Sequence, residues 1–164
     1  MLNEIIKHIR DRDYMSGVER EKSRVKANGE IFTPTPLVQE ILDKMPKELF
    51  TDPKKTILDP TSGDGQFLGE VIIKKMENGS TLEQALSTTY GVDLMQDNVD
   101  LCRERLLCGH EEFRSIVEKN IVCADALEYD YSFDGTWEQK QKDQVAKENQ
   151  VKEGKEQVNN LFGF

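Results

Sequence analysis

Residues 57–68 carry the clearest chemical signal in the chain. An apolar run ends at Asp59, and Gly63 and Gly65 follow within six residues. The apolar run is typical of the end of a buried strand, and glycine lets the backbone approach a ligand where a Cβ would collide. From Gln66 onward the apolar residues recur at helical spacing, which predicts a helix packed on the sheet. The pattern predicts a turn that binds a nucleotide cofactor, and a purely structural turn in another α/β protein is the alternative.

The same turn lacks the features of a dinucleotide site. The G-x-G-x-x-G fingerprint needs a third glycine for close packing beside a pyrophosphate, and Leu68 occupies that position here. Asp59-Pro60 stands at the expected strand end, where a carboxylate would repel a pyrophosphate. A carboxylate instead suits a ligand with a cationic end, such as S-adenosyl-L-methionine.

Two further acids end apolar runs downstream. Asp93 belongs to the expected strand 90–94, and Asp125 to the expected strand 120–127. Right-handed crossovers bring the carboxyl ends of parallel strands to one edge, so three such ends predict an α/β, Rossmann-like cofactor half. An acid after the second strand typically binds ribose hydroxyls. A capping or solvated role for Asp93 stays open.

Two segments resemble one enzyme family. Residues 59–68, Asp-Pro-Thr-Ser-Gly-Asp-Gly-Gln-Phe-Leu, resemble the D-P-x-x-G-x-G-x-F-L cofactor motif of adenine-N6-specific DNA methyltransferases, including type I restriction-modification methylase subunits. Residues 29–34 resemble the family's G-x-[FY]-[FY]-T-P segment, and their position upstream matches the gamma-type motif order. The resemblance implies a Rossmann-like S-adenosylmethionine-dependent fold. It also implies roles for individual residues: Phe32, Thr33 and Asp59 at the methionine end, Asp93 at the ribose, Leu94 beside the adenine, and Asp125 at the adenine amino group. The full set of cofactor-binding residues that it implies is Phe32, Thr33, Pro34, Asp59, Pro60, Gly63, Gly65, Phe67, Asp93, Leu94, Asp125 and Ala126.

The family's catalytic [NDS]-P-P-[YF] motif is not found. The nearest remnant, residues 159–162, contains neither proline. The resemblance covers residues 20–134, and a chain of 164 residues is expected to hold the cofactor half without the substrate half. We therefore expect a methyltransferase whose active site needs a partner. The alternative is a catalytically inactive module that binds the cofactor or modulates a DNA modification enzyme, and a methyltransferase acting on small molecules or proteins fits residues 29–34 least.

Charge and composition limit the partners. The net charge is -9 and the pI about 4.8, so contact with DNA is expected to be weak or to pass through a second methyltransferase or specificity subunit. The basic residues between Arg20 and Lys26 are diluted by glutamates. A homo-oligomer stays open. Reduced cysteines, with neither a signal peptide nor a membrane segment, favour the cytoplasm of a bacterial cell or phage-infected host.

Three parts are expected along the chain. Residues 1–28 form an N-terminal helical segment, 29–134 the cofactor-binding domain, and 135–164 a polar tail that is helical, disordered or folded on a partner. Thr35 and Asp97 are expected to cap helices, and Thr81 with Gln84 to form a capping box. No metal site is expected. The candidate ligands are Cys102, Cys108, Cys123 and His110, but Cys102 and Cys123 fall at buried positions.

Overall fold

The computed structural model describes residues 1–11 and 33–162, with side chains as far as residue 152. It contains two compact units, Met1–Asp130 and Tyr131–Phe164. The predicted cofactor residue Phe32 and the basic residues 20–26 lie outside the described residues.

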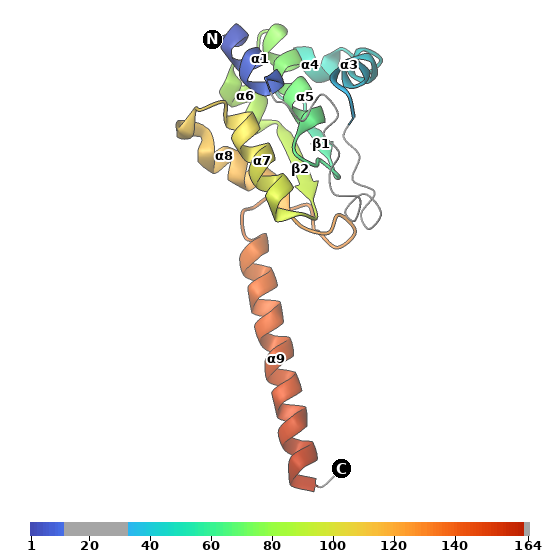
Figure 1. The fold of residues 1–164 in the computed structure, drawn as a ribbon, viewed down its shortest axis with the longest axis vertical. Helices are drawn as coiled ribbons and strands as arrows, with labels where there is room; N and C mark the ends of the chain where they lie inside the picture. Colours follow the sequence, from blue (N-terminus) through green and yellow to red (C-terminus); the bar gives the residue numbers. More distant parts are fainter. Residues whose placement is uncertain (12–32, 163–164) are drawn as a thin grey trace. The chain divides into compact units, whose positions relative to one another are not determined.

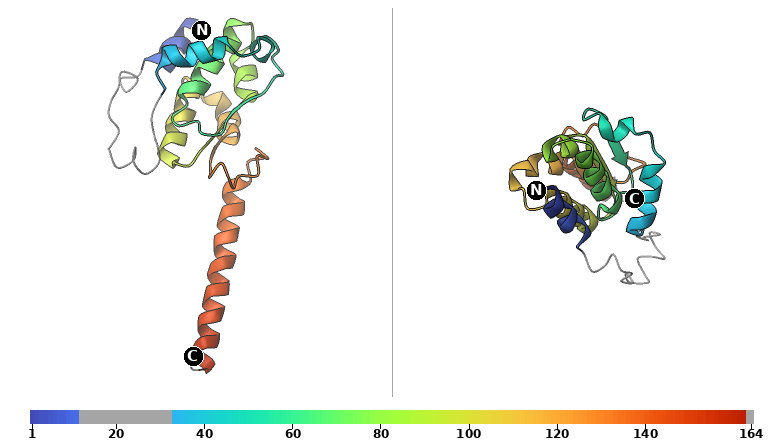
Figure 2. Two further views of the ribbon diagram at one scale, coloured as in Figure 1. Left: turned by 90° about the vertical axis from the view of Figure 1, so that its right-hand side faces the viewer. Right: turned by 90° about the horizontal axis from the view of Figure 1, so that it is seen from above.

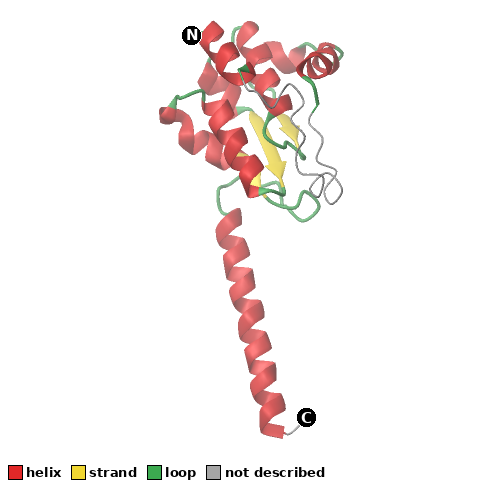
Figure 3. Cartoon of the chain, viewed as in Figure 1, coloured by secondary structure: helices red, strands yellow, loops and turns green. Residues whose placement is uncertain are grey.

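The first unit is built on a small parallel sheet (Figures 1 and 3). Its strands are β1 (Ile57–Asp59), β2 (Thr89–Asp93) and β3 (Ile121–Cys123), in the order β1-β2-β3. Asp59 lies opposite Gly91, and Asp93 lies opposite Cys123. This fold is compatible with the predicted α/β class and with part of a methyltransferase-like domain. The third strand is shorter than expected, because Asn120 ends a helix and the ladder stops at Cys123.

Helices pack against this sheet and against one another. They are α1 (Leu2–Arg10), α3 (Thr35–Asp43), α4 (Glu48–Thr51), α5 (Gln66–Glu77), α6 (Leu82–Ser87), α7 (Gln96–Leu107), the short 3-10 helix η2 (Glu111–Phe113) and α8 (Arg114–Asn120). Helix α5 packs on β1 and β2 and also contacts α1, α3, α4, α6 and α7. It therefore connects the sheet to the helices around it.

Two apolar clusters meet on α5. The larger is formed by Ile5, Ile9, Leu68, Ile72, Ile73, Met76, Leu82, Ala85, Leu86, Val99, Cys102, Leu106, Leu107, Val117 and Ile121. The smaller is formed by Val38, Leu42, Phe50 and Val71, with Met45, Leu49, Ile57 and Phe67 packed against it. Helix α5 contributes Leu68, Ile72, Ile73 and Met76 to the larger cluster and Val71 to the smaller, so it presents apolar side chains in two directions.

The N-terminal helix is part of this core. Ile5 and Ile9 of α1 are 1% and 2% exposed. A Cβ at Gly69 of α5 would lie 2.7 Å from Ile9 Cγ2, so the missing side chain lets α1 approach closely. Seen from above, α1 and α3 flank α5 on different sides (Figure 2). The predicted amphipathic helix thus packs on the unit that carries the sheet.

Two predicted helix caps are wrong, although the capping box of Thr81 and Gln84 is confirmed. Helix α3 is capped by Pro34, and the Thr35 hydroxyl instead accepts a hydrogen bond from Gln66 Nε2 at 2.8 Å. Helix α7 begins after Met95, so Asp97 lies inside its first turn. The partner of Thr35 is 31 residues away in the sequence, whereas Asp97 accepts a hydrogen bond from the backbone N of the next residue, Asn98.

The second unit consists largely of helix α9 (Trp137–Phe162), which has 26 residues. Thr136 donates backbone and hydroxyl hydrogen bonds to Asp134 before the helix begins, and these bonds hold the pKa of Asp134 below its usual value. Val145 and Val151 are exposed on the helix. Among the described helices, none has the length and apolar character needed to cross a bilayer.

One buried lysine of α5 bonds to the residues that precede β1 and β2. Lys75 is fully buried, and its Nζ donates to Lys55 O at 2.9 Å, Thr88 O at 3.1 Å and Thr88 Oγ1 at 2.6 Å. Burial lowers the pKa of Lys75 to about 8. These acceptors are neutral, so no opposing charge in this group of contacts offsets the cost of burying the ammonium.

This lysine should make stability depend on pH. Below pH 8 both the folded and unfolded states carry the proton, and folding bears the full desolvation cost. Between the folded pKa and the unfolded value of about 10.4, only the unfolded state binds it, so the free energy of unfolding should rise by up to about 1.4 kcal/mol per pH unit. Urea unfolding between pH 7 and 9.5 should show this rise in the native chain, and Lys75→Met should lack it. Parallel pH profiles in the two proteins would contradict the assignment.

Candidate cofactor site

The glycine turn between β1 and α5 depends on backbone that glycine adopts readily. Gly63 and Gly65 have φ values of 52° and 83°, and Gly65 is the N-cap of α5. A Cβ at Gly65 would lie 2.6 Å from Cys102 Sγ of α7. Both the left-handed conformation and the close approach of α7 therefore favour glycine here.

Asp93 holds this turn in place from the end of β2. Its Oδ2 accepts a hydrogen bond from Gly63 N at 2.9 Å, and its Oδ1 accepts from Met95 N at 2.9 Å and Asn98 Nδ2 at 3.1 Å. The carboxylate therefore joins the glycine turn to the start of α7. A structural role of Asp93, which the sequence left open, is present in this geometry.

The loop after β1 also bonds directly to β2. The Ser62 backbone N donates to Val92 O at 2.9 Å, and the Ser62 hydroxyl donates to the same oxygen at 3.3 Å. A Cβ on the neighbouring Gly91 would lie 2.7 Å from Leu68 Cδ1 and 3.0 Å from Ser62 Oγ. Because Gly91 has no side chain, the loop after β1 and the N-terminal turn of α5 can pack closely against β2.

Asp59 adds a second carboxyl group to this edge. Burial raises the pKa of Asp59, the nearby Asp93 carboxylate adds to the increase, and hydrogen bonding by Thr61 opposes it. Thr61 N donates to Asp59 Oδ1 at 3.0 Å. A positive charge beside these two carboxyl groups would offset the cost of ionising Asp59.

The predicted adenine-binding residues follow β3. Ala124 N donates to Asp93 O at 2.9 Å, which links this segment to the end of β2. Asp125 is exposed, and its Oδ1 accepts a hydrogen bond from Leu127 N at 2.8 Å. Leu94 is 59% exposed and Ala126 is half-buried. The structure therefore brings Gly63 and Asp93 into direct contact and places Asp59 on the adjacent strand, opposite Gly91. Asp125 lies two residues beyond the strand position opposite Asp93.

The remaining predicted residues lie around α3 and the turn. Thr33 is half-buried and Pro34 is exposed at the start of α3, and Pro60 is exposed after β1. Phe67 packs against the smaller apolar cluster between α3, α4 and α5. The bond between Thr35 and Gln66 joins the start of α3 to the residue after Gly65. The start of α3, which directly follows residues 33–34, is therefore adjacent to the end of the glycine turn.

The sequence did not predict a buried ion pair beneath the turn. Arg105 Nη1 of α7 lies 3.3 Å from both Asp64 Oδ1 and Asp64 O, and both side chains are fully buried. Asp64 Oδ2 accepts no hydrogen bond within the described part of the chain. Arg105 shares the buried face of α7 with Cys102, three residues earlier. A charged residue on an apolar stripe was the signal available in the sequence, because such a residue needs a partner.

The cysteines have different environments. Burial raises the pKa of the Cys102 thiol strongly, which keeps it protonated and unreactive. Cys108 and Cys123 are partly exposed. Within residues 1–11 and 33–152, no group of three or more His, Cys, Asp or Glu side chains is arranged to hold a metal.

The Asp64–Arg105 pair allows a sharp stability test. Arg105→Met should lower the free energy of unfolding by about 3–5 kcal/mol, because Asp64 would stay buried without its cation. The double variant Asp64→Leu/Arg105→Met should recover most of this loss, since no charge would remain buried. Urea unfolding of the native chain and the two variants measures both effects. A double variant that is no more stable than Arg105→Met alone would show that the pair holds the turn by shape and not by charge compensation.

Comparison with known proteins identifies the family. A family model described as N-6 DNA methylase matches residues 18–153. The match includes both segments that suggested the resemblance, and it continues beyond residue 134 into α9. No curated protein and no solved structure gives a significant match. The family model covers most of the sequence, so the resemblance to adenine-N6-specific DNA methyltransferases is confirmed. The chain belongs to the N-6 DNA methylase family.

Proposed function

We propose that the first unit binds S-adenosyl-L-methionine at the edge formed by the glycine turn and the ends of the strands. The observation that carries the proposal is the hydrogen bond from Gly63 N to Asp93 Oδ2, which fixes bare backbone next to a carboxylate. In the proposed arrangement Asp59 faces the cationic methionine end, Asp93 binds ribose and Asp125 binds adenine. The incomplete Rossmann-like methyltransferase fold is part of the same proposal.

The Asp93 hydrogen bonds are compatible with a bound ribose. A carboxylate offers about four lone-pair positions, and the contacts with Gly63, Met95 and Asn98 use three of them. The remaining position is on Oδ2, beside the glycine turn. A ribose hydroxyl can donate to this oxygen without displacing the bonds that hold the turn.

The electrostatics of Asp59 also fit a cationic ligand. Burial and the neighbouring Asp93 disfavour its ionised form, as the raised pKa shows. An ammonium group beside the two carboxylates would offset this cost and gain a charge-assisted hydrogen bond. An anionic pyrophosphate at the same position would increase the cost.

We further propose that the protein serves DNA adenine-N6 methylation together with another polypeptide. The sequence contains no [NDS]-P-P-[YF] segment, so the polar clamp on the target amino group is assigned to a second methyltransferase or specificity subunit. Such a subunit would also supply the DNA contacts that a net charge of -9 disfavours. An inactive cofactor-binding module that modulates a DNA modification enzyme is the alternative that the activity test distinguishes.

Cofactor binding can be tested by calorimetry with S-adenosyl-L-methionine. The native chain should bind with a micromolar dissociation constant, and Asp59→Asn should weaken binding about tenfold or more through loss of a charged hydrogen bond. Affinity should also fall as pH decreases through the pKa of Asp59, because the protonated carboxyl no longer attracts the ammonium. Asp100→Asn on the exposed face of α7 is the matched control and should bind normally. Absence of binding by the folded native chain would refute the cofactor assignment.

The role of a second polypeptide can be tested by methyl transfer. The chain purified alone should transfer no labelled methyl group from S-adenosyl-L-methionine to DNA adenine. The complex isolated from its native cell should do so, and Asp59→Asn in that complex should reduce transfer. Activity of the isolated chain would contradict the need for a partner, whereas a silent complex that still binds cofactor would favour the inactive module.

A further inference from the structure

Three polar contacts join α3 to α5 at a regular spacing, and we call them the polar ladder. The pairs are Thr35 with Gln66, Gln39 with Glu70, and Asp43 with Lys74. In each pair the partners are 31 residues apart in the sequence. Successive pairs are four residues apart along both helices, so all three lie on one face of each helix.

The constant offset means that the ladder specifies one register between α3 and α5. Apolar contacts of Val38 and Leu42 with Val71 also join the helices, but dispersion and burial are tolerant of small slips. A slip of one helical turn would move α3 by about 5.4 Å along α5. Its three polar side chains would then no longer lie opposite their present partners. The polar pairs therefore select the register, while the apolar cluster supplies most of the attraction.

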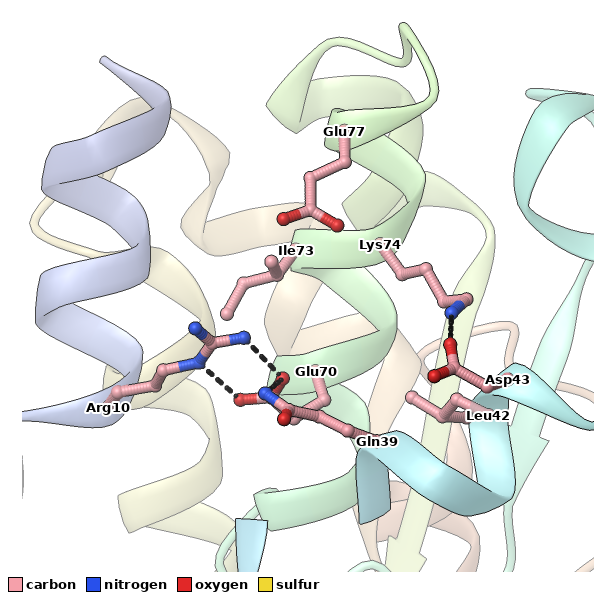
Figure 4. A pocket seen from close by; sticks show the side chains of 8 residues that line it. All are labelled: Arg10, Gln39, Leu42, Asp43, Glu70, Ile73, Lys74 and Glu77. Atoms are coloured by element: carbon pink, nitrogen blue, oxygen red, sulfur yellow. Dashed lines mark hydrogen bonds and ion pairs between the residues drawn. The ribbon is translucent and has the colours of Figure 1, made fainter. Parts of the chain in front are cut away.

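The middle rung is also connected to α1. Glu70 is 4% exposed, and Arg10 donates to both of its oxygens, from Nε and from Nη2, at 2.8 Å each. Gln39 Nε2 donates to Glu70 Oε2 at 3.0 Å. Figure 4 shows Arg10 and Gln39 converging on this carboxylate from two different helices. Glu70 thus fixes α1 and α3 against the same point of α5.

A cavity of about 240 Å³ lies over the middle and last rungs. It is lined by Arg10, Gln39, Leu42, Asp43, Glu70, Ile73, Lys74 and Glu77. Figure 4 shows Arg10 bonded to Glu70 and Lys74 bonded to Asp43 in this lining. Four of the lining residues, Gln39, Asp43, Glu70 and Lys74, belong to the polar ladder.

We propose that the polar ladder positions the start of α3 for cofactor binding, with Gln66, Glu70 and Lys74 as positioning residues. This inference rests on the proposed function. Pro34 O accepts backbone hydrogen bonds from Leu37 at 3.0 Å and Val38 at 3.1 Å, so Pro34 is fixed to the first turn of α3 and Thr33 directly precedes it. The first rung uses Gln66, which directly follows the glycine turn. The register of α3 consequently sets the distance between the Thr33-Pro34 segment and that turn.

The first test removes one rung without touching the proposed cofactor contacts. Gln39→Met keeps the Arg10–Glu70 pair and removes the hydrogen bond to α3. The dissociation constant for S-adenosyl-L-methionine should rise about fivefold, which corresponds to about 1 kcal/mol, a part of the charge-assisted hydrogen bond to the Glu70 carboxylate. Amide exchange at Leu37 and Val38 should accelerate in the absence of cofactor. Asn120→Ala is the control, because it removes the buried Asn120–Leu86 hydrogen bond far from the ladder and should leave both measurements unchanged.

A charge exchange at the last rung provides the rescue. Asp43→Lys places two cations together and should weaken cofactor binding, and adding Lys74→Asp should restore it. Faster exchange in α3 with unchanged affinity would overturn the positioning role, as would weakening by Asn120→Ala to the same extent. If the native chain binds no cofactor, the proposed function fails. Faster exchange at Leu37 and Val38 in Gln39→Met would then still support the ladder as the determinant of register.

Discussion

The structure of the first unit depends on the buried contact between Asp64 and Arg105. Asp64 stands between the two glycines of the turn, and Arg105 reaches it from α7 with both side chains fully buried. A buried ion pair contributes little net stability relative to apolar residues, but it is costly to break. Its value is therefore geometric, since few arrangements of the turn can keep both charges compensated. The glycine turn, the first turn of α5 and the buried face of α7 are held in one arrangement by this requirement.

The proposed site is assembled outward from that fixed turn. Asp93 bonds to Gly63 from one side, and Gln66 bonds to Thr35 from the other. Each contact joins a backbone or side chain of the turn to a different element, β2 in the first case and α3 in the second. The turn is consequently preorganised by neighbours in sequence-distant segments. Preorganisation of this kind reduces the entropy that ligand binding must overcome.

Much of this architecture could be predicted from the sequence, and the reasons for the failures are physical. The strands ending at Asp59 and Asp93 and the helix after Gly65 follow from apolar periodicity and glycine placement, which are local signals. The capping role expected for Thr35 is wrong because its hydroxyl bonds to Gln66, 31 residues away, a partner that the local pattern does not contain. The capping role expected for Asp97 is wrong because α7 begins after Met95, two residues earlier. The Asp64–Arg105 pair and the Glu70 contacts required knowledge of which helices are adjacent. A periodic stripe can show that Arg105 is buried, but it cannot identify the residue that compensates its charge.

The negative charge of this chain has opposite effects on the two ligands of a DNA methylase, a cationic cofactor and DNA. Burial and the nearby Asp93 carboxylate raise the pKa of Asp59, and this arrangement favours a cationic ligand. The same negative potential, added to a net charge of -9, opposes the approach of a phosphate backbone. A bound cofactor would neutralise part of this potential at the site, whereas the repulsion of the remaining surface would persist. Under the proposed function, the cofactor edge and the DNA-binding surface are therefore expected to belong to different parts of the active assembly, with basic residues outside this edge carrying the contacts to DNA.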